Sequence, residues 1–366
     1  MGSVEVYKAG LFVFLLTFLH YSMPAQQFVG LGTGNYAGSG MASVNPSLLN
    51  NSRAYLGVGL ISAGAFFENN YIYFSNSRPA ILEAFQSQPD LDPYAPEDYP
   101  FWHYYGPGYN DISKSAFSHV RLSGPSFMLN GRKDALAFRM EHRSWLAIWN
   151  LPYHLAKFMY EGLDYVPQQN TQYLARDVRI VMAGALSAGL TYSRVLAARQ
   201  QQMLSGGFTL YYLLPSFGSF ISIDALDYMV PNDSLLLVDD FDATYGFALP
   251  MDYNDNSFRA GDGLRMGSGF SLDVGMTYYL LEKDIREADL MKRSCAVPFH
   301  DYRLRIGLSV MDAGKLHFQS NALLHTMEDR STVWPGVDTV GFRNLNYFTN
   351  LLSRQFFPSS GRSLSG

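Results

Sequence analysis

The stretch from Gly267 to Leu280, GSGFSLDVGMTYYL, constrains the fold more than any other part of the chain. Side chains alternate across a β-strand, so positions two apart share a face. The alternation lasts about a dozen residues, close to the roughly 9–11 that cross a bilayer at a tilt, whereas strands of soluble sandwiches usually have about five or six. It predicts a transmembrane β-strand with one face toward lipid and one toward a lumen. The apolar face holds Phe270, Leu272, Val274, Met276, Tyr278 and Leu280, and the small, polar face holds Ser271, Asp273, Gly275, Thr277 and Tyr279.

The composition agrees with a membrane barrel. Charged residues make up 16% of the 366 residues and hydrophobic residues 48%, against a usual charged fraction of about 25%. No apolar run reaches the roughly 18 residues that a transmembrane helix needs. A barrel shows its lipid face only at alternate positions, so it needs no such run. The net charge of −5 argues against a nucleic-acid partner, which favours basic surfaces.

The N-terminus is typical of an export signal. Lys8 precedes an apolar core, Ala9–Leu19, and Ala25 offers a small residue at the expected cleavage site. We therefore expect a signal peptide at residues 1–25 and a single outer-membrane β-barrel domain at residues 26–366, in the bacterial outer membrane. Cys295 is the only cysteine, which excludes an internal disulfide and a thiolate metal cluster.

Several other segments carry the alternating pattern. Asn130-Gly131 is a strong turn signal and predicts a hairpin between Phe117–Leu129 and Ala135–Ile148. Apolar residues at helical spacing predict a short amphipathic helix at Leu151–Asp164. Further strands are predicted near Leu56 and at Gly184–Val195, Gly207–Leu214, Ser219–Tyr228 and Tyr302–Met311, with loops at Ser75–Lys114 and Asp233–Asp262, a turn at Asp312-Ala313-Gly314, and helical or irregular structure at Asn344–Phe357.

Charged residues on the polar faces of these strands are the candidates for a lumen lining, because an aqueous or packed lumen accepts charge and lipid does not. An unpaired buried charge is expensive. We therefore expect the two arginines near position 304 to share carboxylates such as Asp273 or Glu141. The predicted lumen-lining residues are Arg139, Glu141, Arg143, Asp273, Arg303 and Arg305.

A glycine-rich segment follows the signal peptide. Its residues 32–37, GTGNYA, nearly match a dinucleotide-binding fingerprint. That motif requires a preceding strand, for which there is no room here. We expect instead a segment that folds back against other backbone and ends at Asn45-Pro46-Ser47, with Asn45 and Pro46 in a plug or hatch.

Catalytic and metal-binding motifs are not found in the sequence. The histidines show no metal spacing, and neither a nucleophile elbow nor a P-loop is present. Residues 252–256, DYNDN, imitate the start of a calcium loop. Ser257 and Gly263 stand where that loop requires Gly and Glu, so a solvated acidic loop is favoured. We expect no enzymatic activity, no cofactor and no metal.

Several stretches together resemble a known family: FVGLGTGNYAGSGMASVNPSLL, AKFMYEGLDY, GLTYSRVL, and GSGFSLDVGMTYYL followed by YRLRIGLSVMDAGKLHF. They are similar to an uncharacterised family of exported barrel proteins of Bacteroidetes-type bacteria, a domain of unknown function, over most of residues 26–357. Asn45-Pro46 is also similar to the hatch region of long-chain fatty-acid transporters and of the outer-membrane partner in type IX secretion. The resemblance implies a barrel in the outer membrane and implies no substrate.

Two functions follow as expectations. One is a plugged, transporter-like barrel for small hydrophobic or amphipathic molecules. The alternative is a structural or interaction barrel that supports secretion or surface assembly. The expected partners are outer-membrane lipid and other envelope proteins. A conduit predicts a lumen path along the charged residues or an apolar pocket near Asn45, and a scaffold predicts a filled lumen.

The C-terminal end lacks the alternation of a closing strand. Bacterial barrels pair their last strand with their first, yet residues 358–366 read PSSGRSLSG. We therefore expect a C-terminally truncated reading of a longer barrel, with an open sheet beside the first strand.

Overall fold

The structure is a computed structural model. It describes residues 32–73, 103–104, 112–131, 133–258, 266–285, 301–341 and 343–357. The predicted signal peptide, Cys295 and most of the predicted loop at Ser75–Lys114 lie outside these residues.

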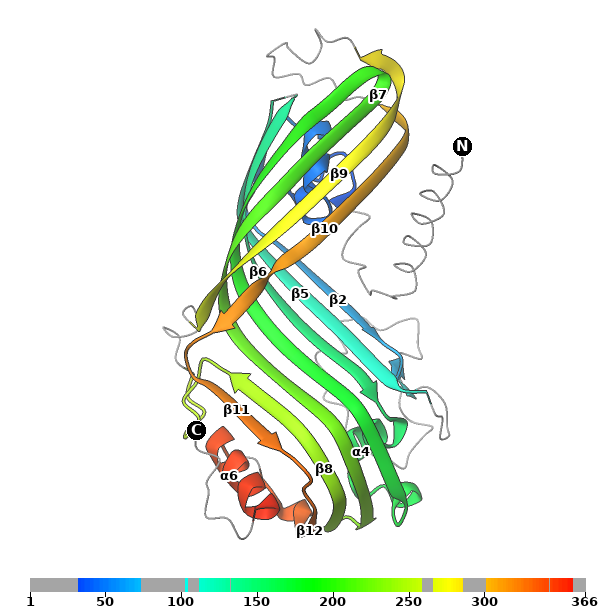
Figure 1. Ribbon diagram of the computed structural model, residues 1–366, viewed down its shortest axis with the longest axis vertical. Helices are drawn as coiled ribbons and strands as arrows, with labels where there is room; N and C mark the ends of the chain where they lie inside the picture. The colour runs from blue at the N-terminus through cyan, green and yellow to red at the C-terminus, as the bar shows by residue number, and fades with distance from the viewer. Residues whose placement is uncertain are drawn as a thin grey trace, which may run out of the picture.

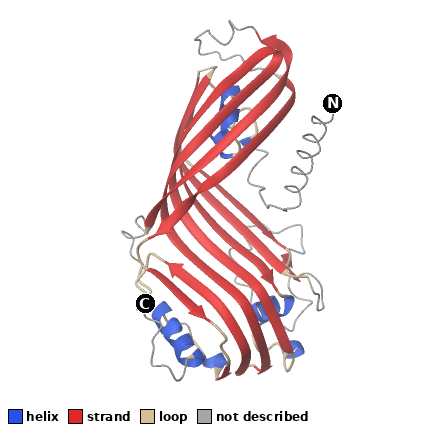
Figure 2. Cartoon of the chain, in the orientation of Figure 1, coloured by secondary structure: helices blue, strands red, loops and turns tan. Residues whose placement is uncertain are grey.

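Long antiparallel strands dominate the described chain, and the helices are short, with some enclosed by the upper strands and the others beside the lower part of the sheet (Figure 2). The strands are β1 (Leu56–Gly59), β2 (Ser62–Asn69), β3 (Ile72–Tyr73), β4 (His103–Tyr104), β5 (Lys114–Asn130), β6 (Asp134–Leu151), β7 (Gln172–Asn232), β8 (Leu235–Ala248), β9 (Gly267–Ile285), β10 (Tyr302–Phe318), β11 (Ala322–Met327) and β12 (Thr332–Pro335). The helices are η1 (Gly38–Ser43), η2 (Pro46–Asn51), α4 (Tyr153–Glu161), η3 (Val166–Gln168), η4 (Val337–Thr339) and α6 (Leu345–Phe356).

In the main sheet, long strands that follow one another in the chain mostly lie side by side. β1 and β2 follow one another along β5, and β5 pairs with β6, which pairs with the first arm of β7. β7 reverses near Gln200, which has a φ of 53°, so that its two arms lie side by side (Figure 1). The second arm pairs with β9 over its first half and with β8 over its second half. β10 then lies beside β9, and β11 and β12 lie beside β8.

The sheet is open. β1 and β2 form one edge and β10, β11 and β12 form the other, and no described strand joins the two edges. The predicted closed barrel is therefore not present in the described chain, whereas the predicted open sheet beside the first strand is. The physical reason is that the chain after β10 continues along β8 and then forms α6 against β12, instead of returning to β1.

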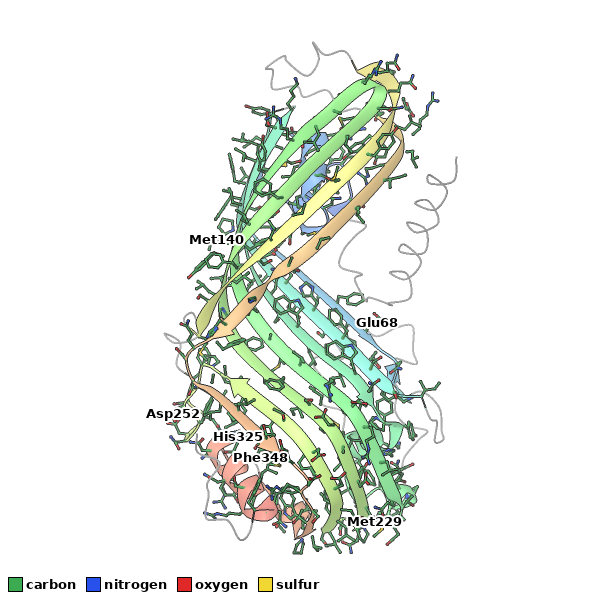
Figure 3. All side chains as sticks on the ribbon, viewed as in Figure 1. Glu68, Met140, Met229, Asp252, His325 and Phe348 are labelled. Carbon is green, nitrogen blue, oxygen red and sulfur yellow. The ribbon has the colours of Figure 1, made fainter. Side chains whose placement is uncertain are left out.

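The two halves of the sheet differ in shape (Figure 1). In the upper half, which holds β9 and β10, the strands curl around η1 and η2. In the lower half the sheet spreads out, with α4 and α6 beside its strands. Side chains cover the strands along their whole length, with Met140 near the middle of the sheet and Met229 at its lower end (Figure 3).

Alternation in β9 matches the prediction. On the apolar face, Phe270, Leu272, Val274 and Met276 are exposed. On the polar face, Ser271, Asp273, Gly275 and Thr277 are buried. The predicted hairpin is also confirmed as β5 and β6, although the connection runs from Asn130 to Asp134 and is longer than two residues. The predicted amphipathic helix is confirmed as α4, and α6 provides the helical structure predicted near the C-terminal end.

Two local predictions are wrong. The acidic stretch predicted as a loop contains β8, whose residues pair with β7 over most of their length. The predicted turn at Asp312 is a β-bulge inside β10, where the register shifts between Val310 and Ala313 and Asp312 has a φ of 56°. An extra residue in one strand bends and twists it without ending it. None of the helices in the described ranges has the length and hydropathy that a membrane-spanning helix needs.

Candidate functional site in the curled half of the sheet

Residues 38–52, here named the plug segment, lie inside the curl of the upper strands (Figure 1). Asn45 fixes this segment. Its Oδ1 accepts a hydrogen bond from the Ser47 backbone N–H at 2.9 Å and so caps η2, the usual use of Asn before a helix. Its Nδ2 donates to the carbonyl oxygens of Met276 at 3.2 Å and Leu308 at 3.3 Å. One side chain thus joins the plug segment to both β9 and β10.

A glycine notch receives Asn45 and Pro46. It consists of Gly207 on β7, its register partner Gly275 on β9, and Gly307 on β10. A Cβ at Gly275 would overlap the Asn45 side chain, and a Cβ at Gly207 would lie 2.8 Å from the Pro46 carbonyl carbon. Glycine is used where backbone must approach this closely. The predicted plug residues therefore lie where three neighbouring strands lack side chains.

Further polar contacts hold the rest of the plug segment. Asn50 donates to the Lys133 carbonyl at 2.9 Å, and Asn130 donates to the Asn50 carbonyl at 3.3 Å. Ser205 and Ser309 donate to plug carbonyls at 3.1 and 2.9 Å. Apolar packing completes the anchorage through a buried cluster that includes Met41, Leu49, Met128, Met203 and Tyr279.

An arginine cluster lies beside the plug segment on the same inner face. The Glu141 carboxylate is 1% exposed, and its oxygens lie 3.3 Å from Arg139 Nε, 3.4 Å from Arg143 Nε and 3.7 Å from Arg121 Nε. Three guanidinium groups around one carboxylate offset the cost of burying that charge. Arg139 also donates to the Tyr211 hydroxyl and to the Ser39 carbonyl of the plug segment. The cluster is therefore connected to the plug.

The bulge in β10 extends this network. Arg143 Nη1 donates to Asp312 Oδ1 at 2.8 Å, and the Asp312 backbone N–H donates to Asp273 Oδ1 at 2.6 Å. Four of the six predicted lumen residues, Arg139, Glu141, Arg143 and Asp273, are thus brought together on the inner face.

The two predicted arginines of β10 behave differently. Arg305 donates to the Thr33 carbonyl at 3.0 Å and lies over the Tyr302 ring, and Arg303 is exposed. Among the described contacts, neither forms an ion pair with Asp273 or Glu141, contrary to the expectation. The cause is local: the register shifts between Tyr302 and Leu304, which interrupts the alternation at Arg303.

A cavity of about 560 Å³ opens between the plug segment and the inner face of β2, β5 and β6. Its wall opposite the sheet includes Gly34 and Ala37, which precede the plug segment, and Gly40 within it, and its sheet-side wall includes Gly64 and Ser123. The charged residues of its wall are Arg121, Arg139 and Glu141.

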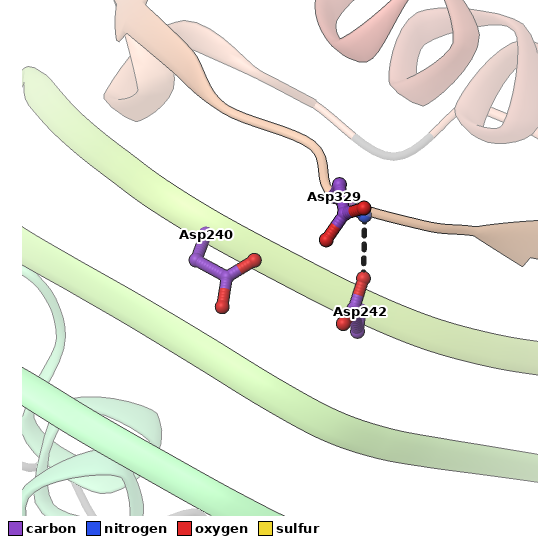
Figure 4. Close-up of side chains that lie close together, drawn as sticks. All are labelled: Asp240, Asp242 and Asp329. Atoms are coloured by element: carbon purple, nitrogen blue, oxygen red, sulfur yellow. Dashed lines mark hydrogen bonds between the residues drawn. The ribbon is translucent and has the colours of Figure 1, made fainter.

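Three aspartates meet in the lower half of the sheet (Figure 4). Ligand oxygens of Asp240, Asp242 and Asp329 lie within 4.8 Å of one another, a spacing that could hold a metal ion. The Asp329 backbone N–H donates to Asp242 Oδ1 at 2.5 Å. Exposed acidic groups are common without an ion, and the expectation of no metal stays a prediction.

The stretch at residues 252–256 is separate from these aspartates. Its Asp252 caps a turn by accepting a hydrogen bond from the Asn254 backbone N–H at 2.9 Å.

Residues 46–362 match the model of a family described as a family of unknown function, DUF5723. The chain belongs to the DUF5723 family. No curated protein and no solved structure matches the chain. The family membership agrees with the resemblance to a domain of unknown function, whereas the similarity to fatty-acid transporters and to the type IX secretion partner stays a prediction.

Sequence reasoning missed three residues of the site in this DUF5723 member: Arg121, Tyr211 and Asp312. Arg121 lies between Val120 and Leu122, so the alternation that identified Arg139 would have found it. Tyr211 has a similar signal, since it alternates with Leu210 and Tyr212. Alternation gave no signal for Asp312, because the bulge determines on which face of β10 its side chain lies.

Proposed function

We propose that this DUF5723 member forms the wall of a plugged outer-membrane β-barrel that passes small hydrophobic or amphipathic molecules. The observation that supports it most is the division of the curled sheet into an apolar outer face and a polar inner face that holds a docked plug segment.

The outer face is apolar and exposed in the curled half. Leu308 is 78% exposed, Phe270 69% and Val58 66%, whereas Asp273 and Thr277 on the inner face are each 1% exposed. Contiguous apolar surface of this kind marks an interaction site or a membrane-facing surface. On a transmembrane barrel the apolar side chains contact lipid and the polar ones face the lumen.

The proposal requires that the open edges of the sheet be paired within the membrane. In hydrocarbon each bare backbone N–H or C=O costs several kcal/mol. Within the membrane, the edge at β1 and β2 and the edge at β10 must therefore be paired with other strands. The partners proposed are outer-membrane lipid at the apolar face and, at the edges, strands of envelope proteins or of this protein.

The alternative function, a structural or interaction barrel, is favoured by one observation. The two arms of β7 together span 61 residues, whereas about 9–11 residues per strand cross a bilayer. The lower sheet, with β8, β11, β12 and α6, would project well beyond the membrane and offers a surface for other proteins.

Reconstitution separates these functions. The purified protein would be refolded into liposomes, and uptake of a fluorescent amphipathic probe compared with empty liposomes and with Gly275→Val, which displaces Asn45 from the glycine notch. A plugged conduit predicts uptake above the empty liposomes and faster uptake by the variant. Insertion with uptake equal to that of empty liposomes for both proteins would support the scaffold, and failure to insert would contradict pairing of the open edges by copies of this protein alone.

A further inference from the structure

We propose that the cavity between the plug segment and strands β2, β5 and β6 binds a small organic anion, with Arg121 as the residue that contacts its carboxylate or other oxyanion group. The proposal deepens the conduit function proposed above, because it names the ligand class. Binding itself requires only the folded plug and sheet.

The charges on the cavity wall favour an anion. Two guanidinium groups, those of Arg121 and Arg139, and one carboxylate, that of Glu141, line the cavity. Arg143 is engaged on the other side of the cluster by Asp312 at 2.8 Å. Asp312 and Asp273, which balance the charge of the whole cluster, are not among the cavity residues, so the cavity wall itself presents two guanidinium groups and one carboxylate. Hydrogen bonds from guanidinium groups to oxyanions are strong.

Within the cluster, Arg121 is the arginine best placed to contact a ligand. Its Nε lies farthest from Glu141, at 3.7 Å, compared with 3.3 Å for Arg139 and 3.4 Å for Arg143. Its side chain is 13% exposed, compared with 8% and 6% for the other two. Arg121 is therefore the most accessible of the three guanidinium side chains, and it lines the cavity.

The remaining walls suit an uncharged organic body. Gly34, Ala37, Gly40 and Gly64 place backbone and methyl groups around the space, beside the uncharged polar side chains of Asn35, Tyr36, Ser43, Ser62 and Ser123. Such walls offer van der Waals contact and no further charge, so an ion without an organic part would gain little from them. The volume of about 560 Å³ lies in the range of small-molecule sites, roughly 300–1,000 Å³.

Calorimetric titration of the full chain, refolded in detergent, tests this site. The probes are hexanoate, its uncharged counterpart hexanamide, and inorganic phosphate. We expect saturable binding of hexanoate, with hexanamide and phosphate each at least tenfold weaker. Equal binding of hexanamide would overturn the anion requirement, and equal binding of phosphate would overturn the organic body.

Variants assign the site. Arg121→Gln should weaken hexanoate binding at least tenfold, a factor that corresponds to about 1.4 kcal/mol. The matched control is Arg194→Gln, since Arg194 pairs with Asp134 at 3.7 Å on the surface and is not among the cavity residues, and it should bind as the wild type does. Equal losses in both variants would overturn the assignment.

A second variant keeps the test valid if Arg121→Gln does not fold. Ser62 pairs in register with Ser123, which pairs with Glu141, so all three share the inner face. Ser62→Phe fills the cavity without removing a charge and should abolish binding; unchanged binding would contradict the location. Because these titrations need no membrane, a negative result is distinct from failure of uptake in liposomes.

Discussion

Arg143 on β6 and Asp312 on β10 form an ion pair, with 2.8 Å between Nη1 and Oδ1. The two arms of β7 and strand β9 lie between these strands in the sheet, so a flat sheet would hold them about 19 Å apart at the usual strand spacing. The pair therefore requires a curled sheet. It also shows that the bulge in β10 has a structural role, because the bulge turns Asp312 inward.

Removing the charge of Asp312 should destabilise the curl. Asp312→Asn keeps a residue that tolerates the positive φ of 56° and leaves Arg143 with one charged partner fewer. We expect the free energy of unfolding in urea to fall by about 1.5–3 kcal/mol, the usual contribution of a hydrogen bond to a charged group. The control is Asp301→Asn, whose partner Arg53 lies on the surface at 3.2 Å, where a pair contributes about 0–1 kcal/mol. Equal losses would contradict a special role for the Arg143 pair.

Crowding the glycine notch should release the plug segment. A methyl group at Gly275 overlaps the Asn45 side chain, and overpacking typically costs about 1–3 kcal/mol. Gly275→Ala should accelerate amide hydrogen exchange in residues 38–52 by at least tenfold. Gly40→Ala is the control, because no atom lies within 4 Å of the added Cβ. If exchange in the plug is unchanged in Gly275→Ala, the notch does not hold it.

Charge on the outer face should be costly in lipid. Arginine at Leu272 or Met276 should reduce the free energy of folding into a bilayer by about 2–4 kcal/mol, the range for the membrane midplane. The control is Val333→Arg, since Val333 is 62% exposed on β12 in the lower half and should cost about 0–1 kcal/mol. Equal costs at the upper and lower positions in a bilayer titration would show that the upper half is not the membrane-facing part.

Acid should weaken the packing of α4. His154 is buried, its Nδ1 shares a hydrogen bond with the Tyr228 hydroxyl at 2.8 Å, and burial lowers its pKa below the usual value. The unfolded chain then binds the proton more readily, so stability falls as the pH drops through the ordinary histidine pKa of about 6.5. Wild type should lose stability between pH 7.5 and 5.5, and His154→Gln should lose less. The free energy of unfolding would be measured by urea titration at each pH. A parallel loss of stability in both proteins would show that His154 is not the cause.

Much of the wall could be predicted from the sequence because strand alternation is a local property. The faces of β9, the β5–β6 hairpin, α4 and the inward positions of Arg139, Glu141 and Arg143 all follow from residues within a few positions of each other. Asn45 was predicted as a plug residue, but its hydrogen bonds to Met276 and Leu308 cross more than 230 positions and have no local signal.

The remaining features depend on partners that alternation does not specify. A period of two gives the face of a strand and not its neighbour, so β11 and β12 beside β8 could not be anticipated. β8 itself was hidden by its acidic composition. The bulge at Asp312 inverts the expected face, because one extra residue moves every following side chain to the other side.

The contact of the outer face with lipid is the central claim, and fluorescence quenching tests it most directly. Cys295 would be replaced by serine, and single cysteines at Val274, Leu308, Thr277 and Ser205 labelled in protein refolded into liposomes. The first two side chains are exposed and the last two buried. The proposal predicts strong quenching by lipid-attached nitroxide at Val274 and Leu308 and weak quenching at Thr277 and Ser205. Quenching of the Val274 and Leu308 labels by a water-soluble quencher, with none by the nitroxide lipid, would contradict it.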